Sequence, residues 1–307
     1  MPSLGEAMKA RYPGESVGAI ALREAVLASC QQFLDAGLGD RNAAKRLAST
    51  NHAVFYQQLT EVLLTRVLRD AGFQMEHQER GPDIRAVRGT TRILVEAICP
   101  TAVGVPPDWL LPPYGRKVVV HTYPQQELLL RWTAAIKEKS EKLLGNDDRN
   151  VGGYLRSGDV TRDEAYVIAV NGCLLRSGPF SSLLGISQLP LAVEATLGVG
   201  PQQVTFNRET GRATDAGHQF RPTIHRGSAA SVPSAVFLDE RNGPVSAVWA
   251  VDLNEGLLVG QNSQPMAVVH NPNATNPVDE GVLPSDVEYF GVSTKGTMEL
   301  TSRVGRR

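Results

Sequence analysis

The sequence has few cysteines, and they follow no metal-binding or disulfide pattern. Cys30, Cys99 and Cys173 are odd in number and far apart, and no CxxC pair is present. We therefore expect neither a disulfide framework nor a structural zinc site, and we expect a reducing, cytoplasmic location. The sequence also contains no signal peptide and no apolar run of about 18 residues. Export by a signal peptide and insertion into a membrane are not expected.

The chain also has little net charge and few lysines. Its 307 residues carry a formal net charge of −1, so the molecule as a whole does not attract a polyanion and any phosphate binding has to be local. There are seven lysines, and three of them, Lys137, Lys139 and Lys142, lie within six residues. With 42% hydrophobic and 21% charged residues, the composition is typical of a folded globular protein.

Apolar periodicity divides the chain into three parts. Residues 1–50 predict an N-terminal helical segment, with a break at residues 37–39. Residues 51–175 predict the core, in the order helix 53–71, strand 73–79, hairpin 81–98, strand 117–121, helix 125–144 and buried strand 166–170. Residues 176–307 predict an α+β extension packed on this core, with a helix between 180 and 197 and strands at 203–207, 235–238, 245–253 and 266–269.

The hairpin places two carboxylates opposite each other. Gly89 and Thr90 form a type II′ turn signal, and the resulting register pairs Asp83 with Glu96. Like charges at directly paired positions are destabilising, and a cation held between them would reverse that effect. Mg²⁺ is typically held by one or two carboxylates. The alternative is a solvated strand face that carries two ordinary acids.

At this point the chain resembles the PD-(D/E)xK nuclease superfamily. The matching features are Pro82-Asp83 before the second strand, Glu96 in the third, and the order helix, three strands, helix, strand over residues 53–171. The resemblance implies an α/β fold with a restriction endonuclease-like αβββαβ core and a mixed central sheet. It also implies that Asp83, Glu96 and Glu61, which lies in the first helix, hold Mg²⁺ or Mn²⁺. The implied activity is hydrolysis of nucleic acid, with DNA favoured over RNA.

One position departs from the family pattern, because Ile98 stands where the motif lysine is expected. Some members supply that lysine from the following helix. Here Lys139 takes an apolar position in the stripe of helix 125–144, and a lysine that faces the sheet needs a partner. We therefore expect Lys139 to replace the motif lysine, whereas Lys137 and Lys142 should leave the helix on other faces. Alternatively, Lys139 extends its ammonium group from the helix edge into solvent.

Two other functions are compatible with the sequence. A chain that lost its lysine without replacement would be a catalytically inactive nuclease fold that serves as a binding or scaffolding protein. An unrelated carboxylate-pair hydrolase, such as a glycosidase, is less favoured, because the acids lie in one short hairpin and aromatic residues make up only 6% of the chain. The sequence leaves open whether the chain forms a homodimer.

Overall fold

The central hairpin forms with the register that the sequence predicts. In the computed structural model, which describes residues 3–77, 80–110, 122–177, 183–225, 231–260, 264–294 and 297–306, strand β2 (Ile84–Arg88) pairs antiparallel with β3 (Thr91–Ile98). Arg88 lies opposite Thr91 and Ile84 lies opposite Val95. Gly89 adopts a φ of 61°, which the tight connection requires. Asp83, directly before β2, therefore lies beside Glu96.

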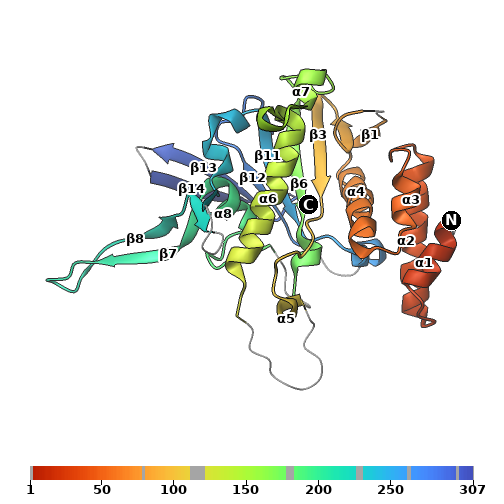
Figure 1. Cartoon of the computed structure of the whole chain (residues 1–307), viewed down its shortest axis with the longest axis horizontal. Helices are drawn as coiled ribbons and strands as arrows, with labels where there is room; N and C mark the ends of the chain where they lie inside the picture. The colour runs from red at the N-terminus through yellow and green to blue at the C-terminus, as the bar shows by residue number, and fades with distance from the viewer. Residues whose placement is uncertain are drawn as a thin grey trace.

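The hairpin belongs to an eight-stranded mixed sheet with the order β1-β2-β3-β6-β11-β12-β13-β14 (Figure 1). The other strands are β1 (Gln74–Glu76), β6 (Ala165–Asn171), β11 (Val245–Val251), β12 (Met266–His270), β13 (Val287–Thr294) and β14 (Thr297–Val304). Strands β3, β6 and β11 are parallel to one another, whereas β1–β2, β2–β3, β11–β12 and β13–β14 are antiparallel pairs. Strands β12 and β13 are parallel. The C-terminal part of the chain thus extends the sheet that the hairpin begins.

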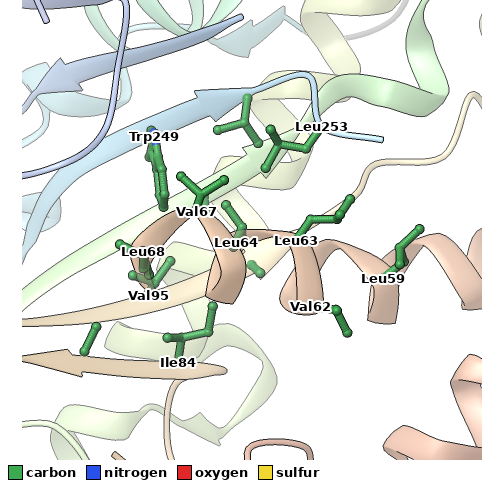
Figure 2. Packing of buried hydrophobic residues seen from close by; sticks show 14 of the residues in the cluster. Leu59, Val62, Leu63, Leu64, Val67, Leu68, Ile84, Val95, Trp249 and Leu253 are labelled. Atoms are coloured by element: carbon green, nitrogen blue, oxygen red, sulfur yellow. The ribbon is translucent and has the colours of Figure 1, made fainter. Parts of the chain in front are cut away.

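Helices cover both faces of this sheet. Helix α4 (His52–Asp70) packs on one face against Val95 and Trp249 (Figure 2), and α6 (Gln125–Leu144) and α8 (Leu191–Leu197) pack on the other. The period of two in β3 explains this arrangement, because alternate side chains point to opposite faces. Each fully buried leucine in these two layers contributes roughly 1.5–3 kcal/mol.

The N-terminal helices form a separate layer outside α4. They are α1 (Leu4–Arg11), α2 (Val17–Asp35) and α3 (Ala43–Leu47), in agreement with the helical segment that the sequence predicts. Helix α2 also contacts the C-terminal 3₁₀ turn η5 (Glu255–Val259), and the Tyr56 hydroxyl donates to Glu255 at 2.6 Å. No helix in the described part of the chain has both the length and the apolar character that a membrane span requires.

The remaining elements are short. Near the carboxyl end of α6 lie β4 (Gly145–Asn146), β5 (Val151–Gly152) and α7 (Tyr154–Ser157), and α5 (Pro107–Leu110) follows β3. The other short elements are β9 (Thr223–His225), β10 (Ser231–Pro233) and the 3₁₀ turns η1 (Asp147–Arg149), η2 (Gly172–Leu175), η3 (Val236–Leu238) and η4 (Glu240–Asn242). A two-stranded hairpin of β7 (Val199–Phe206) and β8 (Ala213–Phe220) projects from the body (Figure 1).

One sequence prediction for the C-terminal part is corrected. In the strand predicted at 235–238, residues 236–238 form the 3₁₀ turn η3, because the chain turns there through i→i+3 hydrogen bonds and buries Phe237. A helix does lie between 180 and 197, as predicted: it is α8, which begins after Pro190. The strand predicted at 117–121 lies outside the described residues, as do residues 78 and 79 of the strand predicted at 73–79.

Candidate functional site

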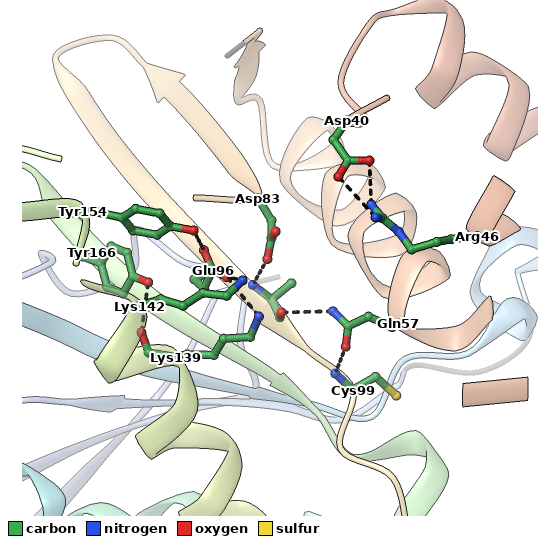
Figure 3. Close-up of polar contacts among 11 residues, drawn as sticks. Asp40, Arg46, Gln57, Asp83, Glu96, Cys99, Lys139, Lys142, Tyr154 and Tyr166 are labelled. Atoms are coloured by element: carbon green, nitrogen blue, oxygen red, sulfur yellow. Dashed lines mark hydrogen bonds and ion pairs between the residues drawn. The ribbon is translucent and has the colours of Figure 1, made fainter. Parts of the chain in front are cut away.

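Glu96 is the centre of a buried ion-pair cluster. Its side chain on β3 is fully buried, and one oxygen, Oε1, accepts hydrogen bonds from Lys139 Nζ at 2.9 Å and Lys142 Nζ at 2.5 Å (Figure 3). The Tyr154 hydroxyl donates to the other oxygen, Oε2, at 3.3 Å. A buried carboxylate without such partners would be strongly destabilising. The fold therefore gives the buried Glu96 carboxyl group three hydrogen-bond donors beneath α6.

The position of Lys139 follows from the packing of α6. Only 5% of its side chain is exposed, although the residue carries a charge. The buried hydroxyl of Tyr166 on β6 donates to the Lys139 carbonyl oxygen at 3.2 Å, which holds this turn of α6 against the sheet. Leu129, Trp132, Ile136 and Leu143 of the same stripe are buried as well. Lys139 thus reaches Glu96 from a position that the apolar stripe fixes.

Asp83 lies beside this cluster at the end of the β2–β3 ladder. Its Oδ2 accepts a hydrogen bond from the Ala97 amide at 2.7 Å (Figure 3). Burial and then the negative charge of Glu96 raise the pKa of Asp83 to about 6, while Lys139 and Lys142 lower it in part. The two carboxylates that the sequence pairs are therefore close enough to repel each other, as like charges on directly paired residues do.

Glu61 approaches from the opposite helical layer. It lies on α4 with 7% of its surface exposed, and burial followed by the charge of Asp83 raises the pKa of Glu61 to about 8. Its Oε2 accepts from Gln58 Nε2 at 2.6 Å, and Gln58 in turn accepts from Arg46 Nε at 2.6 Å. Arg46 is paired with Asp40 at 2.8 Å (Figure 3). This chain of polar contacts fixes the Glu61 carboxyl group.

The structure brings the predicted residues Asp83, Glu96 and Lys139 into one cluster, with Glu61 near enough to act on Asp83. Lys137 points away, as expected, with 69% of its side chain exposed. The prediction for Lys142 was wrong. It lies three residues after Lys139 on the same side of the helix, and its flexible stem lets the ammonium group return to Glu96. Burial lowers the pKa of Lys142, but the negative charges of Glu96 and Asp83 together raise it above the ordinary value.

Tyr154 and Gln57 complete the cluster. The chain turns after α6 through Gly145, with a φ of 88°, and Gly153 lies so close to the backbone of Leu143 and Gly145 that a Cβ atom there would clash. This turn brings Tyr154 over Glu96, and in the sequence only the glycines indicate such a turn.

Gln57 on α4 contacts the end of β3. Its side-chain amide donates to the Ala97 carbonyl oxygen at 3.1 Å, and its side-chain oxygen accepts from the Cys99 amide at 2.9 Å. Gln57 thereby holds the end of β3.

Comparison with protein-family models, with curated proteins and with solved structures finds no match to this chain.

The acidic residues suit a hard divalent cation, although they do not form a complete coordination sphere. Within the described ranges, no three His, Cys, Asp or Glu side chains lie close enough together to hold a metal ion. Mg²⁺ needs only one or two carboxylates when water and substrate phosphate supply the other ligands. Asp83 and Glu96 provide such a pair. Burial, followed by the charge of a neighbouring carboxylate, raises the pKa values of Asp83 and Glu61, and a bound cation would favour their ionised forms.

Proposed function

We propose that this chain is a metal-dependent nuclease of the PD-(D/E)xK superfamily that hydrolyses phosphodiester bonds in nucleic acid, DNA more readily than RNA. One observation supports the proposal: Lys139, from the helix after the acidic strand, contacts Glu96 at 2.9 Å. In the proposal, Lys139 takes the role of the lysine that is absent at Ile98. Apart from the short elements α5, β4, η1, β5 and α7, the element order α4, β1, β2, β3, α6, β6 supports a restriction endonuclease-like core. So does the sheet order β1-β2-β3-β6.

Each residue of the cluster has a chemical role in this proposal. Asp83 and Glu96 would hold Mg²⁺ or Mn²⁺, which polarises a phosphodiester and lowers the pKa of a bound water, and Glu61 would reach the ion through a water molecule. The Lys139 ammonium group would orient the attacking water and stabilise the negative charge that develops on phosphorus-bound oxygens. Lys142, with 42% of its side chain exposed, faces the solvent side of the cluster, where it can meet a substrate phosphate.

Replacement of Lys139 by methionine tests the proposal. Methionine keeps an unbranched stem in the apolar stripe and removes the charge, so Lys139→Met should lower the rate of Mg²⁺-dependent cleavage at least about 100-fold. Lys137→Met is the matched control, because Lys137 lies on the same helix with 69% of its side chain exposed, and this variant should cleave like the wild type. The measurement is cleavage of labelled single-stranded DNA, duplex DNA and RNA with Mg²⁺ or Mn²⁺.

The second candidate function is a nuclease fold that binds but does not cleave. It is favoured by the three donors that already surround the Glu96 carboxylate, since such a group can be a structural ion-pair centre. Wild-type protein that cleaves none of these substrates with either metal would support this function. Equal cleavage by Lys139→Met and wild type would instead assign Lys139 a structural role.

A further inference from the structure

A pocket opens directly beside the Glu96 cluster. It has a volume of about 490 Å³ and lies between the end of α6, the turn formed by β4 and β5, and helix α7. Lys142 and Tyr154 form part of its wall, and the same two side chains bond to Glu96. Pockets that hold small organic groups commonly measure about 300–1,000 Å³. A group bound here would therefore lie next to the proposed reaction centre.

The walls of this pocket favour a planar, hydrogen-bond-donating group over a free anion. Tyr154 supplies an aromatic ring, and Glu138, Glu141 and Asp159 supply carboxylate oxygens that accept hydrogen bonds. The cations are Lys142, which is bonded to Glu96, and Arg149, whose guanidinium lies 3.7 Å from Glu141. Three acids against two bases leave the lining with a formal charge of −1, so inorganic phosphate alone is disfavoured.

We propose that this pocket binds the base and sugar of a nucleotide adjacent to the cleaved phosphate. The inference rests on the proposed nuclease function and specifies its substrate class. A base stacked on Tyr154 can donate its exocyclic amino group to the acidic rim, so adenine, cytosine and guanine fit better than thymine. A base inside the pocket cannot stay stacked in a duplex. The substrate is therefore single-stranded nucleic acid or an unpaired end.

Calorimetry on the metal-free protein tests the pocket without any cleavage. We expect 2′-deoxyadenosine 5′-monophosphate to bind at least fivefold more tightly than thymidine 5′-monophosphate, and inorganic phosphate to show no binding. Val151 lines the pocket with 55% of its surface exposed, so Val151→Trp should fill the space and weaken binding at least tenfold. Val204→Trp is the matched control, since Val204 is 50% exposed on the projecting hairpin (Figure 1) and should not alter binding.

A second pair of variants guards against misfolding of the tryptophan variant. Glu138→Ala removes an exposed carboxylate of α6 that lines the pocket, and Glu24→Ala removes an exposed carboxylate of α2 outside the lining. Glu138→Ala should weaken binding of 2′-deoxyadenosine 5′-monophosphate at least threefold, and Glu24→Ala should leave it unchanged. Absence of binding at millimolar nucleotide, or equal binding by wild type, Val151→Trp and Glu138→Ala, overturns the inference.

Cleavage assays separate failure of this inference from failure of the proposed function. Faster cleavage of single-stranded DNA than of blunt duplex DNA, with loss of that preference in Val151→Trp, supports the pocket as a substrate site. Metal-dependent cleavage without nucleotide binding retains the nuclease and rejects the pocket. Nucleotide binding that Val151→Trp removes, in a protein that cleaves nothing, retains a nucleotide pocket and rejects the nuclease.

Discussion

The ionisation of Glu61 should make the free energy of unfolding depend on pH. Its folded pKa of about 8 lies above the ordinary value of 4.5. Between these two values the unfolded chain is ionised while the folded chain keeps the proton, so stability of the metal-free protein should fall as pH rises through this window. Glu61→Gln keeps an oxygen that accepts from Gln58 and removes the ionisation. At pH 9 with EDTA it should be more stable than the wild type by about 2 kcal/mol.

Urea denaturation between pH 5 and pH 9 measures this difference. Exposed Glu24 on α2 supplies the control, and Glu24→Gln should keep the pH dependence of the wild type. Added Mg²⁺ should reduce the loss of stability at high pH in the wild type and not in Glu61→Gln, because a bound cation stabilises ionised carboxylates. If wild type and Glu61→Gln lose stability in parallel up to pH 9, the carboxyl group of Glu61 is not protonated at neutral pH.

The sequence predicted correctly the positions of those site residues that lie in a regularly repeating pattern of apolar and polar side chains. The period of two in β2 and β3 set Asp83 beside Glu96, and the apolar stripe of α6 pointed Lys139 at the sheet. Lys142 and Tyr154 could not be found this way. The first reaches Glu96 through the bend of a long flexible stem, and the second depends on a tight turn that follows the helix.

At the scale of elements, the glycine turn between α6 and α7 shapes both the cluster and the pocket. A Cβ atom at Gly153 would meet backbone atoms of Leu143 and Gly145, which cannot move aside as a side chain can. Gly153→Ala should therefore destabilise the protein by about 1–3 kcal/mol and weaken nucleotide binding, because Tyr154 follows directly. Thermal denaturation monitored by circular dichroism measures the first effect.

The control for Gly153→Ala is Gly18→Ala, which should change the stability in the opposite direction. It lies in α2 with nothing near the position of an added Cβ, so Gly18→Ala should raise stability by up to about 1 kcal/mol. A Gly153→Ala variant as stable as the wild type would mean that the turn is looser than its backbone contacts indicate.

Long helices with a regular apolar stripe could be predicted from the sequence, whereas short or partly exposed elements could not. Helices α4 and α6 run over about five turns each, and their apolar stripes identify them without ambiguity. The segment Val236–Leu238 is too short for a period of two to be told from a turn of 3₁₀ helix. The last two strands of the sheet, β13 and the edge strand β14, were not predicted, because polar residues such as Glu288 and Thr301 interrupt the apolar pattern expected of a strand.

At the scale of the whole molecule, one sheet joins the core and the C-terminal extension. Strand β6, buried along its whole length, lies between β3 and β11, and β11 comes from the extension. A fragment that ends at residue 175 would expose the full edge of β6, which is a template for aggregation. We expect this fragment to be insoluble or associated on size-exclusion chromatography. A soluble, monomeric fragment that unfolds cooperatively would establish the core as an independent domain.

Removal of the projecting hairpin is the matching control for that truncation. Strands β7 and β8 pair with each other in a separate two-stranded sheet. Replacement of residues 201–219 by a short Gly-Ser linker should therefore leave a soluble protein with a melting temperature close to that of the wild type.

The parallel arrangement of β3, β6 and β11 also governs when the molecule can be completed during its synthesis. Asp83, Glu96, Lys139 and Tyr154 are all translated before β6, yet the far edge of β6 is covered only by residues 245–251. At about 5–20 residues per second, the ribosome needs ~4–15 s to pass from residue 171 to residue 245. If the core folds during this time, the nascent chain carries every acid and lysine of the cluster on a sheet with one uncovered edge. A chaperone that shields this edge would act in that interval.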